Sequence, residues 1–184
     1  RANGRIPQIT VRRAKPGEKI TTLDEKIRTL DSSILVVADS IGAVGIAGIM
    51  GGKDTEVDEN TARVLLEVAR FDPIVIRLGA QKLGLRSEAS MRFEKGLPRE
   101  LASYATKRGL ELFTLHAKAK IVDGPLDVYV DKYRPVIITL DAQLVSRIIG
   151  IPVSVNESRA ILTRLGMKVA GSNIMKVSVP WFRP

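Results

Sequence analysis

Four glycines within eight residues constrain this chain more than any other feature of its sequence. They stand at positions 45, 48, 51 and 52, between an apolar run and an acidic loop. Glycine permits positive φ and lacks a Cβ atom, so another group can lie directly against its backbone. The segment therefore predicts either a tight β-corner between closely packed strands or a corner against which a ligand lies.

The acidic loop 53–60 leads into a second apolar run, 62–69, which predicts a strand carrying one carboxylate, Glu67. A lone carboxylate is costly to bury inside an apolar strand. Glu67 would therefore point to a wet face, pair with a base such as Arg70 or Arg92, or serve a ligand. The residues alone favour a structural ion pair.

Runs rich in β-branched residues predict the other strands of the first half. We expect a hairpin between strands at 9–13 and 20–23, because the intervening A-K-P-G-E-K is a turn sequence. The continuous apolar run 30–39 has the length of a buried strand and would pair with 44–50. This second pair of strands would lie in a sheet that is covered on both faces.

Two helices are predicted next. Asp72-Pro73 places an N-cap before a proline and opens a short helix that Gly84 ends. A longer helix would run from Pro98 through His116, with apolar residues repeating at helical spacing. The residues expected to face inward are Leu101, Ala105, Leu112 and Leu115, with Tyr104 and Phe113 as core aromatics.

Residues 121–132 lose this periodicity and predict a linker before a second domain that begins near Tyr133. A strand at 136–140, two helices and a hairpin formed by 167–170 and 174–179 would follow. The expected helix signals are Asp141 as a cap, Gly150 as a stop, and a capping box from Ser154 to Glu157. The second helix would turn Ala160, Ile161 and Leu165 inward. This order outlines a winged helix-turn-helix.

Composition narrows the classes of protein. Lysine and arginine outnumber aspartate and glutamate by 29 to 20, which favours a polyanionic neighbour such as RNA. Aromatic residues are only 4% of the chain, which argues against a base-stacking platform. The absence of cysteine excludes disulfides and fits a cytoplasmic chain. No apolar run is long enough to predict a membrane span.

Three motifs in fixed order carry a family resemblance. They are I-M-G-G at 49–52, L-L-E-V-A-R-F-D-P at 65–73 and L-R-S-E-A-S-M-R-F-E-K-G at 85–96. Together they resemble the β subunit of bacterial phenylalanyl-tRNA synthetase, over the whole chain. The main departures are Ser87 for a usual threonine and Glu88 for a usual aspartate.

The resemblance implies an α+β fold, with a mixed or antiparallel sheet flanked by helices and then a small winged-helix-like domain. Residues 1–131 would be the C-terminal part of a tRNA editing domain, and 132–184 the family's fifth domain. The editing reaction is hydrolysis of tyrosine misattached to tRNA(Phe). By motif position, its pocket would be formed by Glu67, Gly48, Gly51, Ser87 and Ala89.

Glu67 would accept the tyrosine hydroxyl, the one group that phenylalanine lacks. A site built to bind a hydroxyl rejects the analogue without it, because the buried acceptor is left unpaired. No catalytic base is identified in these 184 residues. The family's histidine lies in an L-H-A-F-D segment expected upstream of Arg1, so the chain would be a cut from a longer polypeptide and inactive alone. His116 lacks triad or metal-ligand spacing.

The resemblance implies no metal and no cofactor within the chain, but ATP and magnesium for the whole enzyme. The expected partners are tRNA(Phe) and a synthetase α subunit, in a cytoplasmic assembly of two α and two β subunits. The alternative is a non-enzymatic winged-helix DNA-binding protein, which rests on the outline of the second domain and the net charge of +9. That alternative leaves the stretches 45–67 and 85–96 unexplained.

Overall fold

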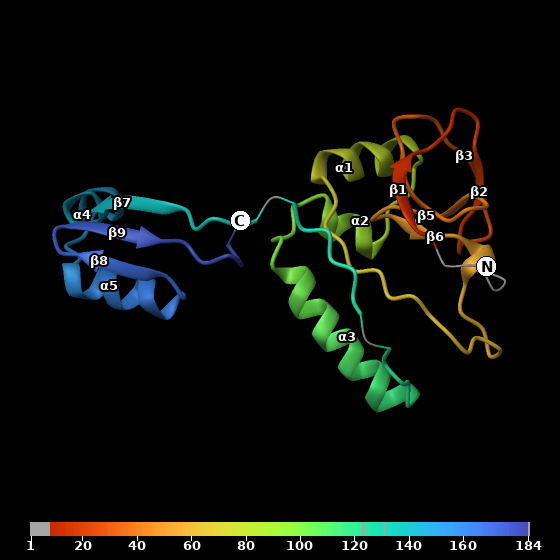
Figure 1. The fold of residues 1–184 in the computed structure, drawn as a ribbon. Helices are drawn as coiled ribbons and strands as arrows, with labels where there is room; N and C mark the ends of the chain where they lie inside the picture. Colours follow the sequence, from red (N-terminus) through yellow and green to blue (C-terminus); the bar gives the residue numbers. More distant parts are fainter. Residues whose placement is uncertain (1–7, 123, 131, 184) are drawn as a thin grey trace. The chain divides into compact units, whose positions relative to one another are not determined.

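The computed structural model describes residues 8–122, 124–130 and 132–183. The chain divides between Leu97 and Pro98 into two compact units, each described here by itself (Figure 1). The opening R-A-N-G-R-I-P, on which the expected cut rests, lies outside the described residues, as do Asp123 and Asp131 of the predicted linker.

The first unit is built on a four-stranded antiparallel sheet with the order β1-β4-β5-β6. Val36 and Val37 are consecutive in β4 and both buried, so both faces of this strand are covered, as predicted. The pairing of β4 with β5 is also confirmed. The four strands are β1 Thr10–Arg13, β4 Leu35–Ala38, β5 Ala43–Ile46 and β6 Met50–Gly51.

The predicted hairpin between 9–13 and 20–23 is wrong. β1 pairs with β4, while β2 Lys19–Thr21 pairs with β3 Ile27–Thr29 in a separate two-stranded sheet. The bend at 15–18 is a real turn, in which the Glu18 amide donates to the Lys15 carbonyl. It redirects the chain into the second sheet instead of folding it back on β1.

Helix α1, Pro73–Lys82, forms where Asp72-Pro73 predicted it. The Asp72 carboxylate accepts hydrogen bonds from the amides of Ile74 and Val75. The inner face of α1 contributes Ile76 and Ala80 to the core. A second helix, α2 Glu88–Phe93, lies beside α1 in a stretch for which no helix was predicted (Figure 1).

The predicted strand at 62–69 is wrong. These residues are extended but pair with no strand, and none of them has a hydrogen bond with another described residue. Val64, Leu65 and Leu66 are 51%, 66% and 40% exposed. An apolar β-branched run becomes a strand only where a neighbouring strand accepts it, so composition alone could not settle this segment.

The second unit begins with α3, Leu101–Ala117, which was predicted from Pro98 to His116. Its expected inward residues are not buried: α3 has no buried residue, Leu115 is 67% exposed and Phe113 is half-buried. Tyr104 is not a core aromatic either. It is 59% exposed and stacks on Trp181, with ring centroids 4.9 Å apart.

The C-terminal part has the predicted order of strand, two helices and hairpin, in an antiparallel sheet with the order β7-β9-β8. Asp141 caps α4 through the Gln143 amide, and Gly150 ends α4 with a φ of +84°. The bounds are β7 Ile137–Asp141, α4 Ala142–Ile149, α5 Val155–Arg164, β8 Lys168–Gly171 and β9 Ile174–Ser178. The strand-and-helix order is therefore confirmed, and the winged-helix assignment stays a prediction.

The inner face of α5 differs from the prediction. Ile161 and Leu165 are 40% and 41% exposed, and Ala160 is also exposed. Ser158 and Leu162 face the core instead, which is centred on Met175. The Ser154 hydroxyl accepts from the Glu157 amide, but no return bond from the Ser154 amide to the Glu157 side chain is present among the described residues. The start of the helix was therefore right, its capping box is only half formed, and its rotation was wrong.

The predicted linker is held by two tyrosines. The Tyr129 hydroxyl donates to the Glu100 carboxylate and accepts from the Tyr133 amide. The Tyr133 hydroxyl in turn donates to the carbonyl of Val179, at 2.8 Å. These bonds place Tyr129 and Tyr133 within the second unit, and the proposed boundary between residues 131 and 132 stays a prediction. The α+β fold class with antiparallel sheets is confirmed.

Candidate functional site

The glycine corner, residues 45–52, consists of the end of β5, a turn and β6. Gly45 pairs with Gly51, and Ile46 pairs with Met50, which closes the corner within three residues. Gly48 lies in the turn with a φ of +65°, a conformation that residues with a Cβ atom rarely adopt. The tight β-corner is thus the arrangement that this segment forms.

The groups that lie against the corner belong to this chain. A Cβ atom on Gly48 would lie 3.0 Å from Cδ2 of Phe71 and 3.1 Å from Cδ1 of Ile76. A Cβ atom on Gly52 would lie 2.7 Å from the carbonyl oxygen of Val44. Core packing and strand pairing therefore account for both glycines without any ligand.

The start of α2 is joined to this corner by one hydrogen bond. Ser87 is the N-cap of α2, and its hydroxyl donates to the carbonyl oxygen of Ile49 at 2.5 Å. The two segments lie 38 positions apart in the sequence. The structure therefore brings Ser87 to the turn that contains Gly48.

The remaining small residues lie on the same two elements. Gly51 is exposed at the end of β6, where a Cβ atom would lie 3.3 Å from Leu23 Cδ1. Ala89 is half-buried in the first turn of α2. Small side chains thus occupy both the corner and the helix start that is bonded to it.

Glu67 lies in the extended segment 62–69 and is exposed. It has no hydrogen bond or ion pair with another described residue, so the predicted pair with Arg70 or Arg92 is not formed. Arg92 pairs with Glu88 at 2.6 Å, and Arg70 donates to the carbonyl of Leu97. Partial desolvation raises the pKa of the Glu67 carboxyl. The convergence of Glu67 with the corner stays a prediction.

Sequence reasoning missed Ser90. Its hydroxyl accepts from the Ser87 amide at 2.9 Å and donates to the Ser87 carbonyl, while its own amide donates to the Ser87 hydroxyl. These bonds complete a capping box, and Ser90 is fully buried. The signal was present as serine three residues after serine, but the usual pattern has glutamate or glutamine at that place.

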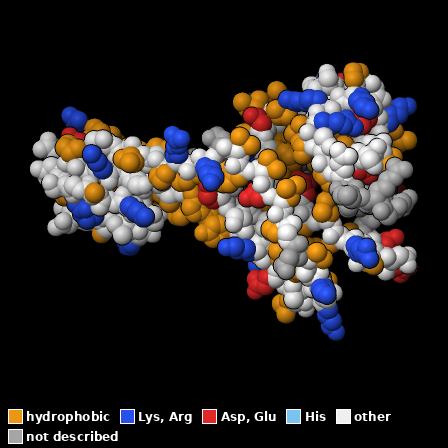
Figure 2. Space-filling model, viewed as in Figure 1, with side chains coloured by type: hydrophobic (Ala, Val, Ile, Leu, Met, Phe, Trp, Pro, Cys, Tyr) orange, Lys and Arg blue, Asp and Glu red, His pale blue; other side chains and the backbone are white. Residues whose placement is uncertain are grey.

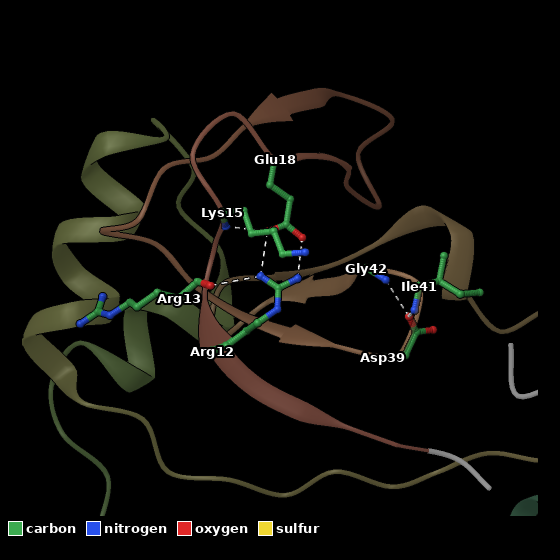
Figure 3. Close-up of polar contacts among 7 residues, drawn as sticks. All are labelled: Arg12, Arg13, Lys15, Glu18, Asp39, Ile41 and Gly42. Atoms are coloured by element: carbon green, nitrogen blue, oxygen red, sulfur yellow. Dashed lines mark hydrogen bonds and ion pairs between the residues drawn. The ribbon is translucent and has the colours of Figure 1, made fainter. Parts of the chain in front are cut away.

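Sequence reasoning also missed an ion pair in the first sheet. Both terminal nitrogens of Arg12 donate to the Glu18 carboxylate, at 2.8 and 2.7 Å, and the Lys15 amide donates to it as well (Figure 3). The hydrogen bond from Arg12 is the main cause that lowers the pKa of Glu18 to about 2. This bidentate pair fastens β1 to the turn that follows it.

The surface adds little to the case for nucleic-acid binding. On the face shown in Figure 2, lysine and arginine side chains are spread over both units and form no single patch. Among the described residues, no group of three or more histidine, cysteine, aspartate or glutamate side chains could hold a metal ion. His116 is exposed in the last turn of α3. No helix in the described part of the chain is long and apolar enough to cross a membrane.

The first unit is thus an α+β domain in which a glycine corner is bonded to the start of a helix. The B3/4 domain family model matches residues 3–118, and the chain belongs to this family. Its sequence is 43% identical over 96% of its length to the phenylalanine–tRNA ligase beta subunit of Moorella thermoacetica. The corresponding subunits of Clostridium acetobutylicum and Carboxydothermus hydrogenoformans are 42% and 40% identical over 96% and 97% of the chain.

These relatives are subunits of an aminoacyl-tRNA synthetase, and the predicted resemblance to the phenylalanine enzyme is confirmed. The chain spans about a fifth, 22%, of the length of each of them.

Proposed function

We propose that the chain forms part of an editing region that hydrolyses tyrosine misattached to tRNA(Phe). The single observation that carries this proposal is the bond between Ser87 and Ile49. It joins two of the three family motifs, which are far apart in sequence, into one local structure. The editing assignment requires these motifs to lie together, because the resemblance places residues from both of them in one pocket.

The chemistry requires a group that distinguishes tyrosine from phenylalanine. Glu67 supplies a carboxylate without a protein partner among the described residues, so its oxygens are available to accept a phenol hydroxyl. Phenylalanine offers no donor, so it would leave the acceptor unpaired.

Small residues on the corner and on α2 suit an aromatic ligand. Gly51 is exposed and Ala89 is only half-buried, so both retain surface that a ring can contact. The reaction would be attack of a positioned water on the ester that joins the amino acid to the tRNA. We assign no catalytic base within the described residues.

The further requirements belong to the whole protein. By similarity to relatives that carry the name of a tRNA ligase beta subunit, it would act with an α subunit in the cytoplasm. The α subunit, in an assembly of two α and two β subunits, would use ATP and magnesium for charging. We assign no site for ATP or magnesium within the described residues.

The test replaces Glu67 with alanine in the full-length subunit assembled with its α partner. Loss of one hydrogen bond to a charged acceptor is worth about 1.5–3 kcal/mol, so hydrolysis of tyrosyl-tRNA(Phe) should fall roughly ten- to hundredfold. Charging with phenylalanine should be unchanged. Glu59→Ala, in the exposed acidic loop, is the matched control and should hydrolyse at the parental rate. Equal hydrolysis by Glu67→Ala and the parent would refute the assignment of Glu67.

A further inference from the structure

Ser87 uses its only hydroxyl proton inside the protein. A serine hydroxyl has one donor, and in Ser87 it goes to the carbonyl oxygen of Ile49. The Ser87 hydroxyl oxygen also accepts a hydrogen bond from the Ser90 amide, at 3.1 Å. The hydroxyl can therefore donate to a bound aminoacyl group only by releasing Ile49.

Ser87 is itself fixed from the other side. Ser90 is fully buried and holds both the amide and the carbonyl of Ser87 through its own hydroxyl, at 2.9 Å each. The Ser87 hydroxyl is thus presented to the corner from a rigid helix start.

The acceptor is the peptide unit in the middle of the corner. The Ile49 side chain is 4% exposed and its amide donates to the Ile46 carbonyl. Because a peptide unit is planar, holding the Ile49 oxygen also fixes the plane that leads into Met50 and β6. Gly48, directly before it, has the positive φ that makes the turn.

We infer that Ser87 is a positioning residue, whose hydroxyl sets the glycine corner and does not read the substrate. The activity test of this inference, hydrolysis of tyrosyl-tRNA(Phe), rests on the proposed editing function. It also accounts for the substitution of serine for the family's usual threonine. Both residues carry the one hydroxyl that the Ile49 carbonyl requires, and the missing methyl plays no part in that bond.

Ser154 offers a matched control on another helix. It is the N-cap of α5 and accepts from the Glu157 amide at 3.1 Å, the same distance as in the cap made by Ser87. No hydrogen bond from its hydroxyl to a distant carbonyl is present among the described residues. Ser154→Ala therefore removes a cap alone, whereas Ser87→Ala removes a cap and the bond to the corner.

The first measurement is hydrogen exchange in the full-length protein without tRNA. The Ala47 amide donates to the Leu35 carbonyl, and the Gly52 amide donates to the Val44 carbonyl. In Ser87→Ala both amides should exchange about tenfold faster, which is the effect of one lost hydrogen bond. Ser87→Gly should do the same, since glycine is a good N-cap and keeps the helix start. Ser87→Thr and Ser154→Ala should leave these amides unchanged. Unchanged exchange in both Ser87→Ala and Ser87→Gly would overturn the inference.

The second measurement is hydrolysis of tyrosyl-tRNA(Phe) by the same variants in the assembled enzyme. We expect kcat to fall about tenfold in Ser87→Ala with little change in KM. Ser87→Thr, which keeps the hydroxyl, should retain the parental kcat. A raised KM with unchanged exchange would mean that Ser87 contacts the substrate, and would overturn the inference. If the parent itself does not hydrolyse the ester, the proposed function fails, while the exchange measurement still decides the role of Ser87.

Discussion

At the scale of the residue, Gly48 shows what a glycine in this chain is for. Gly48 has a positive φ, and the side chains packed against it, Phe71 and Ile76, lie 23 and 28 positions further along the chain. The four glycines predicted that something lies against the backbone. They could not say whether that something is the core or a ligand, because both need the same missing Cβ atom.

Replacing Gly48 with alanine should destabilise the first unit by about 2–5 kcal/mol. Alanine pays roughly 1–2 kcal/mol for the left-handed backbone, and crowding against two core side chains adds about 1–3 kcal/mol. Gly17→Ala is the control, because Gly17 also has a positive φ but has no atom within 4 Å of its Cβ position. It should cost only about 1–2 kcal/mol. Urea unfolding of both variants measures the difference, and equal losses would contradict the packing argument.

The pair formed by Arg12 and Glu18 makes stability depend on pH. The pKa of Glu18 is lowered to about 2 in the folded state, below its ordinary value of 4.5, so the unfolded chain takes up the proton first as pH falls. The contribution is complete above about pH 4.5 and is lost as pH falls towards 2. Water screening at the rim of the unit limits it to about 1–2 kcal/mol.

Glu18→Gln should therefore be less stable than the parent at pH 6 and equally stable near pH 2. Glu56→Gln is the control, since Glu56 forms an exposed ion pair with Lys53 and should change stability little at either pH. The free energy of unfolding of the three proteins, measured by urea titration at both values, provides the comparison. A difference for Glu18→Gln that persists at pH 2 would refute the cause given for it.

At the scale of the element, helices were easier to predict than strands. The starts of α1, α4 and α5 depend on Asp72, Asp141 and Ser154, which bond amides two or three residues away. Such signals are local and can be read along the sequence. The hairpin and the strand at 62–69 were wrong because strand pairing depends on distant partners.

Helix α5 allows a comparison of two serines four residues apart. Ser158 is 5% exposed, and its hydroxyl has no hydrogen-bond partner among the described residues. Ser158→Ala should leave the second unit as stable as the parent or up to about 1.5 kcal/mol more stable, because alanine removes an unpaired polar atom and favours helix. Ser154→Ala should cost about 1 kcal/mol by loss of the cap. Thermal unfolding should show a lower Tm in Ser154→Ala and an unchanged or higher Tm in Ser158→Ala. A lower Tm in Ser158→Ala would reveal an unseen partner.

At the scale of the whole molecule, the chain has two cores with no residue in common. Ile34 and Val36 belong to the core of the first unit, whereas Met175 and Val177 belong to that of the second. The loss of periodicity at 121–132 predicted a linker between two domains, and the boundary drawn from it stays a prediction. The tyrosine bonds that hold the predicted linker are side-chain contacts across long sequence separations, which the absence of periodicity does not reveal.

Met175→Ala should destabilise the second unit alone. Met175 is fully buried, and loss of such a side chain costs about 2–5 kcal/mol. Hydrogen exchange should accelerate in β7 and β9 and stay unchanged in β4 and β5. Ile34→Ala, at 1% exposure in the first unit, should give the reverse pattern. Acceleration across both units in either variant would show that they unfold together.

The candidate site was predicted unevenly for a related reason. Gly48 and Ser87 could be associated because the family motifs supplied the long-range information that local patterns lack. The hydrogen bond from Ser87 to Ile49 could not be predicted, since nothing in the sequence shows which carbonyl a serine hydroxyl will donate to. Ser90 was missed because the usual capping box has a longer acceptor side chain.

The extended segment 62–69 has a consequence for the handling of the protein. Proteases bind their substrates as extended strands and form hydrogen bonds with the backbone, and this segment already has an extended backbone with no such bonds to other described residues. It also carries Arg63, an exposed basic residue after which trypsin can cut. Brief digestion would therefore nick the first unit between β6 and α1, and the two pieces would remain together through the core that Ile46 and Ile76 share.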